Sequence, residues 1–138
     1  MTIFIDTSVV MYAAGGEHPL RRPCTTILDR ISSGSLDATT SVEVVQELVH
    51  RNVSIRRPDE AARLAELTMA MFAPVLPITH AVMRRIPDLI RRYPMLPARD
   101  LVHVATCVHE AIEEIVSADR GFDQVAEVRR IDPLAFAP

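Results

Sequence analysis

The sequence contains no lysine, and this absence excludes enzyme classes that depend on a catalytic lysine. All fifteen basic residues among the 138 are arginines. Tryptophan is absent as well, and the aromatic residues are only four phenylalanines and two tyrosines. Because unpaired bases stack on aromatic side chains, platforms for base stacking are scarce. Any recognition of RNA is therefore expected to depend on phosphate contacts and RNA shape.

Long apolar runs and cysteine pairs are also missing. No apolar run approaches the roughly 20 residues that a membrane-spanning helix needs. The first residues lack the basic segment of a signal peptide, and Asp6 interrupts their apolar stretch. Cys24 and Cys107 are too few and too far apart for a disulfide framework. These absences predict a cytoplasmic protein with reduced thiols. The formal net charge is −3, so no overall positive potential that would attract nucleic acid is expected.

Short β-branched runs alternate with segments of helical periodicity, which predicts an α/β fold. The predicted strands are residues 3–5, 36–40, 75–78 and 115–118, and residues 125–131 are expected to form a last small helix or strand. The predicted helices are residues 9–14, 19–33, 42–51, 58–73, 80–93 and 98–114, with a kink or break at Pro87. We expect one domain over residues 1–138, a three-layer α/β/α sandwich around a mostly parallel sheet of four or five strands.

Two of the predicted strands are followed directly by an acid. Residues 3–5 end at Asp6, and residues 115–118 end at Asp119. Since ligands bind at the carboxyl ends of parallel strands, both side chains are expected at one edge of the sheet. Ser8 is predicted to cap the helix that follows the first strand, which would leave the Asp6 carboxylate free for a ligand.

Two further acids, Glu47 in mid-helix and Asp100 in the first turn of another helix, could face the same crevice. Each of the four acids also has a structural interpretation, as a helix cap, a turn former, a solvated face or a first-turn acid on the helix dipole. The pattern alone leaves both interpretations open. Carboxylates placed close together raise one another's pKa unless a cation neutralises them. Oxygen ligands select Mg²⁺ or Mn²⁺, and such a site suits phosphodiester hydrolysis.

Four short motifs occur in order along the chain. They are D-T-S after the first strand, E-L at residues 47–48, A-R-D-L-V-H-V-A-T at residues 98–106 and S-A-D-R-G-F-D at residues 117–123. Together they resemble a PIN domain, and in a chain of this length the toxin ribonucleases of VapBC-type toxin–antitoxin systems. The resemblance implies a Mg²⁺- or Mn²⁺-dependent endoribonuclease that acts as the toxin of a type II system. The alternative is a non-catalytic PIN-fold module that binds nucleic acid or protein.

The resemblance also assigns residues and partners. It implies that one or two Mg²⁺ or Mn²⁺ ions are held by Asp6, Glu47, Asp100 and Asp119. The auxiliary residues are Asp123, whose role varies, Ser8 and Ser117, which would position the acids, and Glu43, the competitor of Glu47. The resemblance further implies a homodimer and a cognate antitoxin that covers a groove near the acids. The prolines between residues 74 and 97 depart from the family pattern and leave the helix layout there open.

Three other features carry alternatives. His103 is expected to pack behind the site, with a hydrogen bond near the site or a contact with substrate as the alternative. Its spacing to Cys107 suits a metal, but a zinc site lacks the other ligands. An apolar stripe at positions 64, 67, 69, 71 and 72 predicts either core or a surface for a partner. The third feature, a set of basic residues that could contact RNA phosphates or form a solvated helix face, comprises Arg84, Arg85, Arg91 and Arg92.

A second enzyme class also places an aspartate after the first strand of a similar sheet. Aspartyl phosphoacceptors, namely haloacid-dehalogenase-like phosphatases and receiver domains, use a lysine against the phosphate, and this chain has none. The phosphatase pattern D-x-D-x-T is absent too, since Ser8 stands where the second aspartate belongs. Both classes are therefore excluded.

Overall fold

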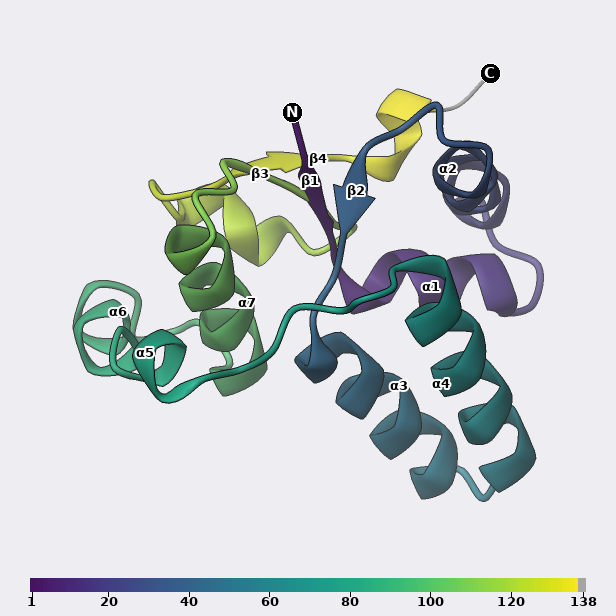
Figure 1. Ribbon diagram of the computed structural model, residues 1–138, viewed down its shortest axis with the longest axis horizontal. Helices are drawn as coiled ribbons and strands as arrows, with labels where there is room; N and C mark the ends of the chain where they lie inside the picture. The colour runs from purple at the N-terminus through teal and green to yellow at the C-terminus, as the bar shows by residue number, and fades with distance from the viewer. Residues whose placement is uncertain (137–138) are drawn as a thin grey trace.

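The computed structural model describes residues 1–136, and a parallel four-stranded sheet lies at its centre (Figure 1). The strands are β1 (Ile3–Ile5), β2 (Ala38–Thr39), β3 (Glu114–Val116) and β4 (Arg129–Ile131). Their order across the sheet is β2-β1-β3-β4, and Phe4 of β1 pairs with Ile115 of β3. The predicted parallel sheet is confirmed, with four strands in the described part of the chain. The two strands that end near predicted acids, β1 and β3, are neighbours.

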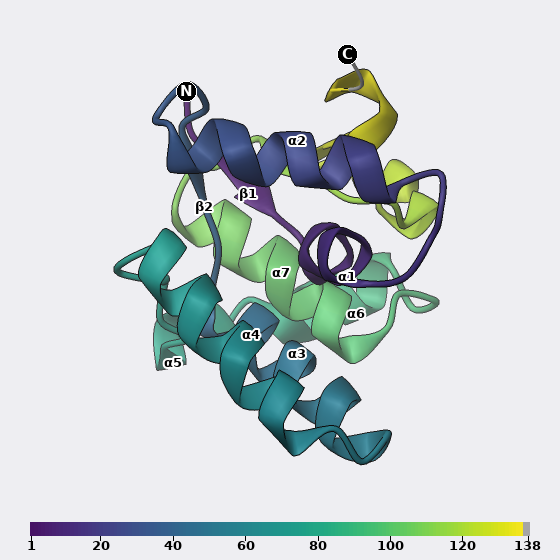
Figure 2. The ribbon, with the colours of Figure 1, turned by 90° about the vertical axis from the view of Figure 1, so that its right-hand side faces the viewer.

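Helices cover both faces of this sheet. They are α1 (Thr7–Ala14), α2 (Arg21–Ser32), α3 (Val42–Ser54), α4 (Pro58–Met71), α5 (His80–Met83), α6 (Ile86–Arg92) and α7 (Ala98–His109). The 3-10 helices η1 (Arg120–Gln124) and η2 (Pro133–Phe136) follow β3 and β4. Figure 2 shows α2 and α7 on opposite sides of β1. Alternate side chains of β1 serve two cores, since Phe4 packs with α3 and α7, while Ile3 and Ile5 pack with α2. The predicted three-layer sandwich is confirmed.

The prediction of one helix over residues 98–114 is wrong at its C-terminal end. The helix α7 ends at His109, because Ala111 adopts a left-handed backbone conformation with φ of 57°. The Ile112 N–H donates to the Cys107 carbonyl at 2.8 Å, the long-range hydrogen bond of a Schellman cap. Glycine is the usual residue at such a cap, so an alanine there gives no sequence signal for the end of the helix.

The segment after α4 also differs from its prediction. Residues 75–78 do not form a strand, because Leu76 makes only an isolated parallel bridge with Ser41. Pro77 has no N–H to donate to a ladder, so the pairing does not continue. The helix expected over residues 80–93 is broken into α5 and α6, as predicted from its internal proline.

The apolar stripe of α4 is divided between core and surface. Leu64 and Phe72 are buried, whereas Leu67 and Met69 are 51% and 45% exposed. Leu67 lines a shallow groove between α1, α2 and α4. The core interpretation is therefore confirmed for Leu64 and Phe72, and a surface for a partner stays a prediction for the exposed part of the stripe.

Neither cysteine is linked to another group in the structure. Cys24 and Cys107 are buried and free, as expected for reduced thiols. Burial raises the pKa of the Cys24 thiol to about 11. Within residues 1–136, no helix combines the length and hydrophobicity required to cross a bilayer.

Replacing Ala111 by glycine is expected to stabilise the protein. Glycine adopts a left-handed φ without the steric cost that alanine carries, so Ala111→Gly should raise the free energy of unfolding by about 0.5–1 kcal/mol in urea denaturation. The matched control, Ala105→Gly in the interior of α7, should lower the free energy of unfolding by about 1 kcal/mol or more. Destabilisation at both positions would contradict the cap.

Candidate active site

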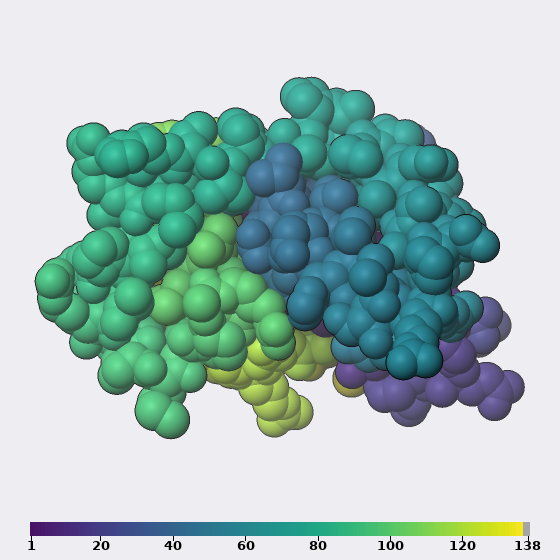
Figure 3. Space-filling view, turned by 90° about the horizontal axis from the view of Figure 1, so that it is seen from below, coloured from purple at the N-terminus to yellow at the C-terminus, as the bar shows by residue number. Residues whose placement is uncertain are grey.

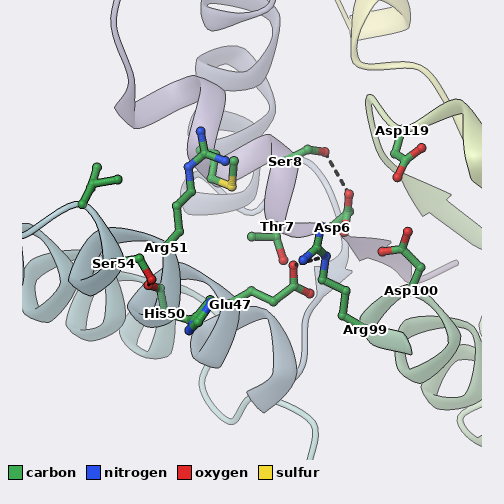
Figure 4. A pocket seen from close by; sticks show the side chains of 12 residues that line it. Asp6, Thr7, Ser8, Glu47, His50, Arg51, Ser54, Arg99, Asp100 and Asp119 are labelled. Carbon is green, nitrogen blue, oxygen red and sulfur yellow. Dashed lines mark hydrogen bonds and ion pairs between the residues drawn. The ribbon is translucent and has the colours of Figure 1, made fainter. Parts of the chain in front are cut away.

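A cavity of about 450 Å³ opens at the carboxyl edge of the sheet, beside the ends of β1 and β3. Figure 3 shows the face of the molecule on which α3, α7 and the segment around η1 come together. The four predicted acids all line the cavity, with Asp6 after β1, Glu47 on α3, Asp100 on α7 and Asp119 after β3 (Figure 4). The other lining residues are Thr7, Ser8, Met11, His50, Arg51, Ser54, Ile55 and Arg99.

Asp6 lies where β1 turns directly into α1. Its carbonyl accepts the first helical hydrogen bond, from the Val9 N–H at 3.1 Å, so Asp6 occupies the N-cap position. The prediction that Ser8 caps this helix is wrong, because α1 already begins at Thr7, one residue before Ser8. The Asp6 side chain makes no capping hydrogen bond, so its carboxylate still faces the cavity.

Two serine hydroxyls hold the Asp6 carboxylate. Ser8 and Ser117 donate to its Oδ2 at 2.9 and 2.6 Å. The same hydroxyls accept backbone N–H groups at the end of β3, from Ala118 to Ser8 at 3.2 Å and from Asp119 to Ser117 at 3.0 Å. This network ties the ends of β1 and β3 together and orients Asp6 relative to Asp119.

His103 connects Glu47 to Asp6 from inside the protein. Its side chain is fully buried, and Nε2 lies 2.6 Å from Oε1 of Glu47 and 3.5 Å from Oδ1 of Asp6. Because an ionised carboxylate only accepts hydrogen bonds, Nε2 carries a hydrogen and donates it to Glu47. Burial opposes protonation of the ring, but the hydrogen bond to Glu47 and the charges of the nearby acids raise the pKa of His103 overall. The prediction that His103 packs behind the site is confirmed, and the ring also contacts Phe4.

Asp100 lies in the first turn of α7 and is only 6% exposed. Burial raises the pKa of this carboxyl to about 7, together with the negative charge of Asp6 and, to a smaller extent, those of Asp119 and Glu47, while His103 opposes the shift. The acids of the cavity therefore share one electrostatic environment. Near neutral pH, a cation in the cavity would favour the ionised form of Asp100.

Asp119 acts as a turn former and also lines the cavity. Its Oδ1 accepts the Gly121 N–H at 2.8 Å and so caps η1. A Cβ added at Gly121 would lie 3.0 Å from this oxygen, so glycine leaves room for the carboxylate to make the cap. The structural and functional interpretations of Asp119 are therefore compatible.

Two of the predicted auxiliary acids lie outside the cavity lining. Asp123 is bound by Arg130, whose Nε lies 2.8 Å from Oδ1 and whose Nη2 lies 3.3 Å from Oδ2. Glu43 lies one turn before Glu47 on α3, and burial raises its pKa. Of these two neighbouring acids on α3, Glu47 lines the cavity and Glu43 does not.

Two arginines that were not predicted from the sequence line the cavity. Arg99 directly precedes Asp100, and its Nε lies 3.5 Å from Oε2 of Glu47. Arg51 lies four residues after Glu47, so the helical spacing from that acid was the available signal.

The arginines that were predicted as possible phosphate contacts lie elsewhere. They are on or beside α5 and α6, and none of the described residues that line the cavity is among them. Arg92 forms ion pairs with Asp88 at 3.3 Å and with Glu127 at 2.6 Å. The solvated helix face is the interpretation that this placement favours.

The donor chemistry of the cavity fits a hard divalent cation, since the four acids offer only oxygen ligands. Within residues 1–136, no group of three or more histidine, cysteine or acidic side chains forms a ready-made metal-binding cluster. The acids are oriented separately, Asp6 by the two serines and Glu47 by His103. A cation shared by three or more of these acids would require their side chains to move closer together.

Comparisons with a family model and with related sequences point to the same family. The chain matches the PIN domain family over residues 3–128. It is 33% identical over 129 residues to the ribonuclease VapC13 of Mycobacterium tuberculosis, a match that covers 94% of this chain and 98% of that protein. It is 36% identical over 132 residues to the ribonuclease VapC7 of the same organism, with 95% and 91% covered.

Solved structures share the fold. The match to VapBC2 from Rickettsia felis, bound to a DNA fragment from its promoter, has a TM-score of 0.74 at 10% identity and covers 96% of this chain and 98% of that chain. The match to FitAcB from Neisseria gonorrhoeae has a TM-score of 0.73 at 23% identity, with the same shares covered. The family match and the sequence relatives together show that the chain belongs to the PIN domain family and, within it, to the VapC type.

Proposed function

We propose that the chain is a Mg²⁺- or Mn²⁺-dependent endoribonuclease that hydrolyses RNA phosphodiester bonds. The observation that carries this proposal is the convergence of four acids, from the ends of β1 and β3 and from α3 and α7, on one cavity. The shared network around Asp6, Glu47 and Asp100 supports it, because each of these acids is either held by a hydrogen bond or perturbed by the others. Relatives named as ribonucleases cover nearly the whole chain.

In this proposal, Asp6, Glu47, Asp100 and Asp119 hold one or two ions. A bound metal would lower the pKa of a coordinated water and stabilise the negative charge that develops on the phosphate oxygens. Ser8 and Ser117 keep the Asp6 carboxylate directed into the cavity, and His103 does the same for Glu47. Asp100 gives up its proton on loading, so its pKa near 7 makes metal binding depend on pH.

We further propose that the chain is the toxin of a type II toxin–antitoxin system. The solved neighbours include VapBC complexes, which supports a cognate antitoxin as protein partner. A homodimer, a cytoplasmic location and one nuclease domain over residues 1–138 complete this proposal.

The alternative is a PIN-fold module that binds nucleic acid or protein without cleaving it. Such a module has no need for a buried carboxyl that its neighbours destabilise, as Asp100 is. The presence of all four acids in one cavity therefore favours the enzyme.

Substitution of Asp6 tests the catalytic assignment. Asp6→Asn removes the charge but keeps the size of the side chain, and RNA cleavage should fall by about 100-fold or more. Cleavage is measured by mapping new 5′ ends in RNA incubated with purified protein and Mn²⁺, with and without chelator. The matched control is Asp59→Asn, at an exposed acid in the first turn of α4, which should cleave as the wild type does. Cleavage by Asp6→Asn at the wild-type rate and positions would refute the assignment.

Substitution of Asp100 should make the metal-free protein more stable at alkaline pH. The pKa of Asp100 is about 7 in the folded protein and about 3.9 in the unfolded chain. Between about pH 3.9 and pH 7 the folded protein therefore binds one proton more than the unfolded chain, and its free energy of unfolding falls as pH rises. Asp100→Asn avoids this loss, and its free energy of unfolding should exceed the wild-type value by on the order of 1–3 kcal/mol at pH 8.

Urea denaturation in the presence of chelator measures this difference. The gain from Asp100→Asn should shrink to about a third at pH 5, where the carboxyl is protonated in the folded protein but still ionised in the unfolded chain. Asp59→Asn again serves as the control, with no gain that depends on pH. An Asp100→Asn variant less stable than the wild type at both pH values would show that the carboxyl is not destabilised by its neighbours.

A further inference from the structure

The cavity extends well beyond its acids. Figure 4 shows His50, Arg51 and Ser54 on the opposite side of Asp6 from Asp100. These three residues follow Glu47 at positions i+3, i+4 and i+7, so they continue the same face of α3. One end of the cavity is therefore acidic, and the other end is lined by donors and by the apolar side chains of Met11 and Ile55.

Arg51 is the cation at this second end. None of the ion pairs formed within residues 1–136 involves Arg51, whereas Arg99, on the other wall, lies 3.5 Å from a Glu47 oxygen. The Arg51 side chain is exposed and lines the cavity, so its guanidinium is available to a ligand. An arginine offers a planar set of donors that matches the geometry of a phosphate group.

The surface continues past Arg51 into a second hollow of about 170 Å³ between α1, α3 and α4. Arg51, Met11 and Ile55 line both hollows, so they form one continuous groove. Arg57 lies further along it. Ile55 is 57% exposed, which leaves apolar surface beside the guanidinium.

We propose that Arg51 binds a backbone phosphate of the RNA strand next to the scissile one, and that Met11 and Ile55 contact the adjoining sugar or base. This inference rests on the proposed ribonuclease function and adds the path of the strand, from the acids along α3 and between α3 and α1. The mixed lining suits this ligand, because a nucleotide carries an anionic phosphate and an apolar base face. The net charge of −3 makes a local cation important, since the acids themselves repel RNA.

Binding of RNA to catalytically disabled protein tests the inference without depending on cleavage. The probe is a fluorescein-labelled single-stranded RNA of about 12 nucleotides, and its anisotropy is followed with Asp6→Asn protein in Mg²⁺ buffer. Adding Arg51→Gln should weaken binding by about tenfold and should reduce the slope of log affinity against log salt by about 1. The matched control is Arg91→Gln, at an exposed arginine of α6 outside the cavity, which should change neither quantity.

Kinetics on otherwise wild-type protein provide a second readout. Arg51→Gln should raise KM by about tenfold and leave kcat within about threefold, while Arg51→Lys should recover part of the loss. Equal RNA affinity for Arg51→Gln and its parent, or an equal loss in Arg91→Gln, would overturn the inference. A wild-type protein that binds RNA through Arg51 but does not cleave it would refute the ribonuclease and leave the RNA path standing.

Discussion

Repulsion between carboxylates at one edge of a parallel sheet is the constraint on which the rest of this structure depends. β1 and β3 are adjacent and parallel, so the acids that follow them must leave the sheet at the same place. Asp100 adds a third carboxyl with 6% exposure, and its pKa is raised by burial first and by the charge of Asp6 second, which reports the cost of that arrangement. Strongly perturbed pKa values of this kind are common at functional sites, where charged side chains are retained for chemistry although they lower stability.

The surrounding hydrogen bonds are arranged to keep these acids in place despite their repulsion. The hydroxyls of Ser8 and Ser117 bridge the two strand ends, donating to Asp6 and accepting from the backbone after β3. His103 reaches Glu47 from the core side of α7, where its ring is supported by Phe4 of β1. The buried imidazole of His103 thus connects the core to the cavity. Because these partners already orient the acids, a bound cation has fewer side chains to order.

Much of this arrangement could be predicted from the sequence because it depends on local rules. A short apolar run that stops at an acid identifies Asp6 and Asp119, and parallel topology then brings them together. The cap of α1 was predicted wrongly, since the single residue between β1 and α1 is Asp6, which takes the N-cap position in place of Ser8. The end of α7 was missed because an alanine occupies a backbone conformation that glycine usually marks. Arg51 could be inferred only from its helical spacing to Glu47, and the place of Arg99 in the cavity depends on how α3 and α7 pack.

The central claim is that the four acids form one cation-binding centre, and Mn²⁺ titration calorimetry tests it most directly. The chelator-treated protein is titrated near pH 7 in two buffers of different ionisation enthalpy, so that proton release is separated from binding. We expect Mn²⁺ to bind with a release of protons that becomes smaller in Asp100→Asn, because that carboxyl must ionise on loading. Absence of binding, or binding that is unchanged when Asp6 and Asp100 are both replaced by asparagine, would contradict the account.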